Sequence, residues 1–281
     1  MKLIKLSLFD VRNGFRQEWI KFLLSFFICI ACCSLMYYQL SLYMRTNTVT
    51  ENITPTFMDY ILYNLRGMKL YSPNLGEEYV LPAVWMFNQI MIALVIGYYP
   101  VKDLCGYGKN TLLRTKSRTF WLTSKVIWVV LMVVLYYVIL YIATFIFCII
   151  TDSKISLVPS EYITNLFYDI DLKNIYVSNF IFCIIVMPIL TSITASVMQM
   201  VLSFVVNPFI SFLSLVGFML LSTYYSVPIL IGNASMIIRS KFIYPDGFTM
   251  ETSLLYLALY LIVSLTTGFI YFRRKDILNK S

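Results

Sequence analysis

Long apolar runs alternate with short polar segments along the whole chain. A helix needs about 20 mostly apolar residues to cross a bilayer. The pattern therefore predicts an all-α integral membrane protein, a single transmembrane permease-like domain over residues 1–281 with six membrane-spanning helices. The expected spans are residues 19–44, 80–99, 120–150, 177–206, 209–225 and 252–272.

The first 18 residues have a different pattern. Leu8, Val11, Phe15 and Trp19 recur at steps of three and four, which places them on one face of a helix. Asp10 falls on the other face. We expect an amphipathic helix over 1–18 that lies on the inner leaflet. The alternative is that these residues form the first turns of the first span.

Proline and asparagine mark several expected breaks. Pro100 should end the second span, because proline lacks the backbone N–H that continues a helix. Asn207 and Pro208 predict a tight turn between spans four and five. Between spans five and six, residues 226–251 contain Pro228, Gly232 and charged residues, so we expect a broken external element there. A short external helix is expected around Phe57.

Charge predicts the orientation of the spans. Of the 22 Lys and Arg residues, 15 fall in the segments placed inside and 7 in those placed outside. Because cytoplasmic loops are enriched in Lys and Arg, both termini should be cytoplasmic. The net charge of +8 is explained by this orientation, so nucleic acid is not an expected partner. A bacterial plasma membrane is the expected location.

The composition removes several catalytic classes. The chain has no histidine, the usual general base near neutral pH and a frequent metal ligand. Five of its six cysteines lie in apolar runs, and only Cys105 should be accessible. Gly106 to Thr111 superficially suggests a phosphate loop, but the required spacing is missing. We expect no enzyme activity, metal or cofactor in this chain itself.

The most basic stretch, residues 100–125, lies between the second and third spans. It contains an acidic residue three positions before a glycine, a Leu-Leu pair, a Ser-Arg pair and a lysine that opens the third span. With the six spans and the amphipathic start, this resembles the type-2 ABC exporter permease family over essentially the whole chain. The matching residues are Asp103, Gly106, Leu112, Leu113, Ser117, Arg118 and Lys125.

The resemblance implies that residues 100–118 form a coupling segment that docks on a separate ATPase subunit, which would bind ATP and Mg. It implies docking roles for Asp103, Gly106, Leu112 and Leu113, to which Lys109, Arg114 and Arg118 would add charge pairing. We expect the Leu-Leu pair to be exposed. A basic loop held by anionic lipid explains the charge equally well, but not an exposed Leu-Leu pair.

The resemblance also implies a dimer of ATPases and a second permease copy, identical or not, with a translocation path along spans one and five. Met36, Tyr37, Phe209 and Phe212 would line this path. These side chains suit a hydrophobic compound or an amphipathic peptide, exported possibly as protection against an antimicrobial peptide. The alternative is a non-transporting membrane assembly or immunity factor that binds a peptide or partner through its external loops.

Overall fold

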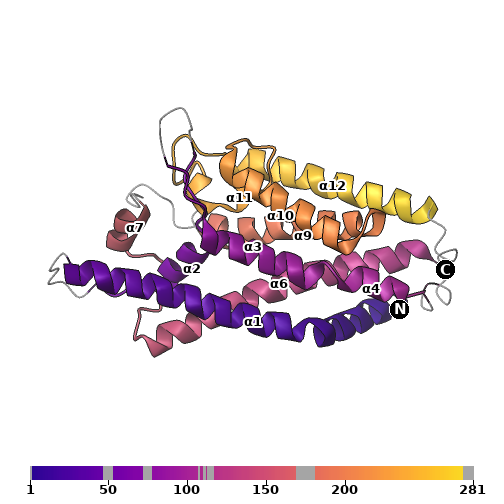
Figure 1. The fold of residues 1–281 in the computed structure, drawn as a ribbon, viewed down its shortest axis with the longest axis horizontal. Coiled ribbons are helices and arrows are strands. Elements are labelled where there is room, and N and C mark those ends of the chain that lie inside the picture. The colour runs from indigo at the N-terminus through magenta and orange to yellow at the C-terminus, as the bar shows by residue number, and fades with distance from the viewer. Residues whose placement is uncertain are drawn as a thin grey trace.

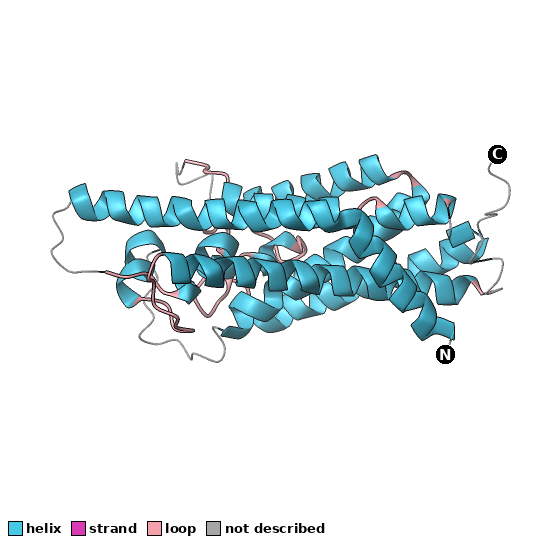
Figure 2. Ribbon diagram, turned by 90° about the horizontal axis from the view of Figure 1, so that it is seen from below, coloured by secondary structure: helices cyan, strands magenta, loops and turns pink. Residues whose placement is uncertain are grey.

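The computed structural model describes residues 2–46, 53–71, 78–106, 108, 109, 112, 117–168 and 181–274. These residues form helices and loops, with no named strand among them (Figure 2). The expected all-α class is confirmed for this part of the chain. Most of the long helices run along one common axis and pack into an elongated bundle (Figures 1 and 2).

Six helices form the bundle and six short ones lie at its ends. The long helices are α1 (Lys2–Thr46), α3 (Ala83–Ile96), α6 (Arg118–Ile150), α9 (Met187–Val205), α10 (Pro208–Tyr224) and α12 (Met250–Arg274). The short ones are α2 (Phe57–Leu65), α4 (Tyr99–Cys105), α7 (Glu161–Tyr168), the π-helix η3 (Phe182–Val186), α11 (Gly232–Ser235) and the 3₁₀ helix η4 (Ile237–Arg239).

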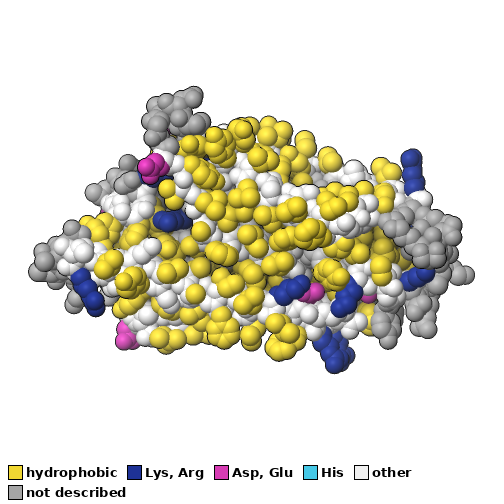
Figure 3. Space-filling model, viewed as in Figure 1, with side chains coloured by type: hydrophobic (Ala, Val, Ile, Leu, Met, Phe, Trp, Pro, Cys, Tyr) yellow, Lys and Arg dark blue, Asp and Glu magenta, His cyan; other side chains and the backbone are white. Residues whose placement is uncertain are grey.

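Five helical segments are long and apolar enough to cross a membrane. They are residues 3–46, 83–105, 118–150, 182–205 and 250–274, whereas α10 is apolar but shorter. Apolar side chains cover the middle of the face seen in Figure 3, and charged ones gather toward its ends. The fold therefore suits an α-helical protein that spans a membrane.

Helix α1 is one continuous element of 45 residues. The expectation of a separate interfacial helix over 1–18 is wrong, and the alternative, an extension of the first span, describes the structure. Leu8, Phe15 and Trp19 are exposed, while Asp10 and Glu18 on the opposite face are buried against the bundle. The pattern is amphipathic as expected, but the polar face is the one that packs inside.

The second span is interrupted earlier than expected. Helix α3 ends at Ile96, and α4 begins at Tyr99 with Pro100 in its first turn, where a missing N–H leaves no bond unmade. The break therefore falls at Gly97. A Cβ atom there would lie 2.6 Å from Gln199 Nε2, so glycine permits the close approach of α3 to α9. The prediction that Pro100 itself ends the span is wrong.

Uncharged polar groups join α3, α6 and α9 inside the bundle. Tyr136 donates a hydrogen bond to Asn88 Oδ1 at 2.8 Å. The Tyr137 hydroxyl lies 2.9 Å from that of Ser192, and Gln199 donates to the Ala93 carbonyl at 3.0 Å. Buried polar groups favour a defined packing when they are paired in this way.

The expected short external helix is confirmed as α2. Thr56 and Asp59 form a capping box at its start. The Asp59 carboxylate also accepts a hydrogen bond from the Ser160 amide, 3.1 Å from Oδ1, which ties α2 to the segment leading into α7. Burial raises the pKa of Asp59 to about 6.

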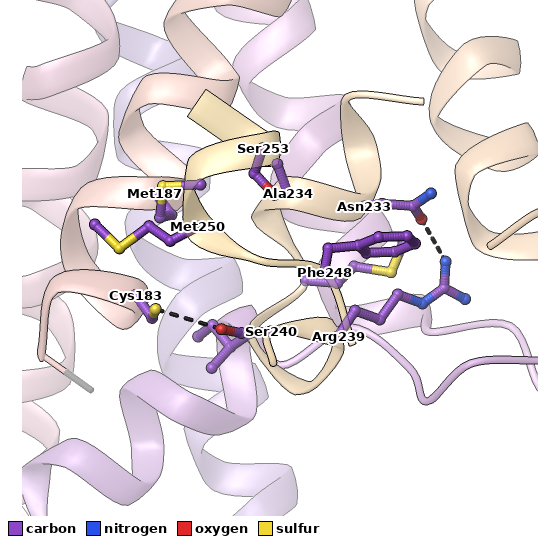
Figure 4. A pocket seen from close by; sticks show the side chains of 11 residues that line it. Cys183, Met187, Asn233, Ala234, Arg239, Ser240, Phe248, Met250 and Ser253 are labelled. Atoms are coloured by element: carbon purple, nitrogen blue, oxygen red, sulfur yellow. Dashed lines mark hydrogen bonds between the residues drawn. The ribbon is translucent and has the colours of Figure 1, made fainter. Parts of the chain in front are cut away.

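The expected broken element between spans five and six is also present, and it folds around Arg239 (Figure 4). This side chain is fully buried. It donates hydrogen bonds to the Asn233 side chain and to four backbone carbonyls, two before α3 and two in the last turn of α10. Burial lowers the pKa of Arg239 to about 10, so it stays charged near neutral pH. Arg239 thus holds three segments together.

Candidate functional site

The segment after the second span lies at one end of the bundle. Helix α4 is found there, together with the start of α1, the start of α6 and the end of α12 (Figure 1). Helices α2, α7 and α11 lie at the opposite end. Three spans therefore meet the polar segment that the sequence singled out.

A buried lysine joins these elements. Lys125, in the second turn of α6, is fully buried. Its ammonium lies 2.7 Å from Asp10 Oδ1 on α1 and 2.6 Å from Asp103 Oδ2 on α4. Taking charges out of water is unfavourable by several kcal/mol per ion unless they are paired closely. We call Asp10, Asp103 and Lys125 the charge cluster.

Neighbouring side chains complete the charge cluster. The Asp10 carboxylate also accepts hydrogen bonds from the hydroxyls of Ser124, at 2.5 Å, and Tyr99, at 3.3 Å. The Lys125 ammonium lies 4.8 Å from the ring centroid of Tyr99 and 5.1 Å from that of Trp121. The cluster has two formal negative charges and one positive charge, and the two hydroxyl donors offset part of the difference.

Two glycines permit the close contacts around the cluster. A Cβ atom at Gly14 would lie 2.0 Å from Trp128 Nε1, so α1 approaches α6 more closely than any other residue would allow. A Cβ atom at Gly108 would lie 2.5 Å from Asp103 Oδ2. These glycines therefore have packing roles, and a phosphate-binding role is not needed to explain Gly108.

Arg118 connects α6 to α12. Its guanidinium donates hydrogen bonds to the carbonyls of Phe272, at 3.2 Å, and Arg273, at 2.9 Å. The rings of Trp121 and Phe272 stack at 5.0 Å beside it. The last carbonyls of a helix have no partner within the helix, so a cation is well placed there.

The proposed docking residues separate into three groups. Asp103 and Arg118 bind within the chain, and Leu112 is only 9% exposed and packs in the core. The expectation that Leu112 is exposed is wrong, because its side chain contributes to the chain's own apolar cluster. Gly106 is exposed at the end of α4 and Lys109 is half-buried. Leu113 and Arg114 lie outside the described residues.

The surface of α4 is polar. Lys102 and Cys105 are exposed, whereas Tyr99 and Pro100 are buried. All six cysteines are free, and Cys105 is the exposed one, as the sequence predicted. A partner that approaches this end of the bundle would meet Lys102, Cys105 and Gly106.

The residues expected to line a translocation path lie apart. Met36 is buried in the larger apolar cluster of α1, α3, α6 and α9, and Phe212 packs against a second cluster. Tyr37 and Phe209 are exposed, at 43% and 72%. Within one chain these residues do not form a common lining, so the path remains a prediction about two copies.

The sequence interpretation missed the link between Asp10 and Lys125. The signal was present, since a charged residue inside an apolar span is rare and usually has a partner of opposite charge. Lys125 lies five residues into an apolar run, and Asp10 is one of four acids in the segments placed inside. Which acid it pairs with depended on the position of α1.

The fold and the site define an all-α protein suited to span a membrane, with a charge cluster at one end. The chain belongs to the family described as "Protein of unknown function (DUF2705)", which matches residues 27–278. No match was found among curated proteins or among solved structures.

Proposed function

We propose that this protein is the membrane permease subunit of an ATP-driven ABC transporter. It has six spans, with α10 as the sixth, and both termini on the cytoplasmic side of a bacterial plasma membrane. Its cargo is a hydrophobic compound or an amphipathic peptide, which it exports. ATP and Mg bind to a separate ATPase dimer, and a second permease copy completes the complex.

The observation that carries the proposal is the connection of α4 to the spans. Lys102 and Cys105 face outward, while Asp103 on the same short helix contacts Lys125 of α6, which contacts Asp10 of α1. A force applied to α4 by a partner would reach two long helices through short ionic contacts. Coupling of distant events requires such a continuous physical connection. The resemblance of residues 100–125 to the coupling segment of permeases supports the same role.

The docking surface differs from the one expected from the sequence. Because Leu112 is buried and Asp103 is paired internally, the exposed part of α4 offers Lys102, Cys105 and the end at Gly106. Contact with an ATPase groove would therefore depend on the Lys102 charge and on Lys109. Interfacial charges of this kind set orientation and association rate.

Co-purification tests the proposal. The tagged protein, isolated from native membranes in mild detergent, should bring down an ATPase, and the Lys102→Glu, Lys109→Glu variant should bring down less. Lys241→Glu is the control, because Lys241 is exposed at the opposite end. An absence of any ATPase, or equal recovery with all variants, would contradict a permease role and favour the non-transporting alternative.

The orientation has its own test. A membrane-impermeant maleimide should label Cys105 in inside-out vesicles and leave it unlabelled in intact cells, since the other five cysteines are buried. Labelling of Cys105 from outside intact cells would reverse the proposed orientation. Cys105→Ser controls for labelling elsewhere.

A further inference from the structure

A cavity of about 350 Å³ lies at the end of the bundle opposite α4. It is formed by the end of α2, the residues after it, the start of α3 and the end of α7. Cavities of this size are in the range that binds small molecules or the end of a larger one. Three features of its lining favour an anionic group.

The first feature is Arg66. Its guanidinium lies 5.0 Å from the ring centroid of Tyr63 and 5.1 Å from that of Tyr168. Among the described residues, no carboxylate forms an ion pair with it. Arginine held between two rings in this way keeps its fork of donors available for an anion.

The second feature is the Tyr168 hydroxyl. The side chain is 2% exposed and lines the cavity, yet within the described part of the chain the hydroxyl has no hydrogen-bond partner. Buried hydroxyls in folded proteins are normally paired, so an unpaired one indicates a missing partner. Burial raises the pKa of Tyr168, so the group remains a donor.

The third feature is the start of α3, whose first residues line the cavity. No side chain caps this helix, and the amides of Val84 and Trp85 have no acceptor among the described residues. Helix starts favour anions because of these free N–H groups and the helix dipole. The remaining wall includes apolar side chains such as Val80, Leu81 and Ile238, of which Val80 is 70% exposed.

We propose that this cavity binds the carboxylate of an amphipathic molecule, either the free C-terminus of an apolar peptide or a fatty acid. Arg66 and the Tyr168 hydroxyl contact the carboxylate together with the free amides of α3, and the apolar wall contacts the adjoining chain. One arginine matches a single negative charge better than a phosphate. This site does not depend on the proposed transport role.

Binding is tested by calorimetry on the full chain in phosphatidylcholine nanodiscs. The probes are N-acetylated trileucine, its C-terminal amide, decanoate and decanol. Each acid should bind at least about tenfold more tightly than its neutral counterpart, because hydrogen bonds to a charged group are stronger than neutral ones. Whichever acid binds more tightly identifies the natural source as peptide or fatty acid.

Two variants test the assigned contacts. Arg66→Gln and Tyr168→Phe should each weaken acid binding by about tenfold, whereas Lys241→Gln, an exposed cation of the same end, should not. Because the Tyr168 hydroxyl has no partner, Tyr168→Phe should leave the melting temperature unchanged or higher, which separates ligand binding from folding. Equal binding of acid and neutral probes, no binding at all, or full affinity in Tyr168→Phe would overturn the proposal. ATPase co-purification is a separate measurement, so failure of either proposal is recognised independently.

Discussion

Replacement of Lys125 is the sharpest test of the charge cluster. Methionine has a similar length and no charge, so Lys125→Met preserves most of the packing against Tyr99 and Trp121 while removing the ammonium. The carboxylates of Asp10 and Asp103, which lie 2.7 and 2.6 Å from that ammonium, would then face each other in a buried site. Two like charges at short distance without a cation disfavour the folded state.

The magnitude follows from the burial of all three groups. Lys125 is 0% exposed at the side chain, and Asp10 and Asp103 are 1% and 8% exposed. Breaking a buried ion pair by removing one partner lowers the free energy of unfolding by about 3–5 kcal/mol. Asp103→Asn alone leaves the Asp10 contact in place and should lower it by about 1–3 kcal/mol.

The triple variant Asp10→Asn, Asp103→Asn, Lys125→Met provides the decisive comparison. It carries no buried charge, and neutral replacement of a whole buried ion cluster is often tolerated. We therefore expect it to be more stable than Lys125→Met alone. The effects of the three substitutions should be strongly non-additive, since the groups are in direct contact.

Unfolding in increasing dodecyl sulfate, followed by tryptophan fluorescence, measures these differences, because Trp121 and Trp128 lie next to the cluster. Lys102→Met is the control, since Lys102 is exposed on the helix that carries Asp103. If Lys125→Met unfolds at the same detergent fraction as Lys102→Met, or if the triple variant is the least stable, the reasoning about this cluster is wrong.

Three further predictions concern packing, pH and the broken element. Gly14→Leu should lower the melting temperature by several degrees, because a side chain there collides with α6; Gly217→Leu, with nothing within 4 Å of its added Cβ, should not. Burial raises the pKa of Asp59 from 3.8 to about 6, so the folded state holds this proton more tightly than the unfolded one; thermal stability should be greatest near pH 4 and decline by about 1–3 kcal/mol as the pH rises to about 6, and Asp59→Asn should flatten that slope. Arg239→Ala leaves four carbonyls without their donor and should lower the unfolding free energy by about 3–5 kcal/mol, measured against the exposed control Lys241→Ala.

The apolar pattern predicted most helices well. The expected third span, 120–150, corresponds to α6 (Arg118–Ile150), and the expected sixth, 252–272, corresponds to α12 (Met250–Arg274). The turn at Asn207 was also predicted, and its side chain accepts a hydrogen bond from the Ile210 amide at 2.7 Å. These features depend on local composition and on local backbone chemistry, which a single sequence contains.

Contacts between helices were less predictable. The apolar face of the first 18 residues was identified, but its environment was reversed, because in a membrane apolar side chains can face outward and polar ones inward. Asp103 and Leu112 were assigned to a partner, yet both meet their own chain. Hydropathy describes what a residue prefers, and only the packing of α1, α4 and α6 determines which neighbour satisfies it.

The length of α1 has a mechanical consequence. At 1.5 Å per residue its 45 residues form a rod of about 68 Å, more than twice the thickness of a bilayer core. One end is clamped to Lys125 through Asp10, and the other contacts α2, where Tyr63 donates a hydrogen bond to Gln39 at 3.3 Å. If the rod stays straight, a 10° tilt about one end shifts the other by about 12 Å. This helix would act as a lever, transmitting a small motion beside α4 as a large displacement at the far side of the membrane.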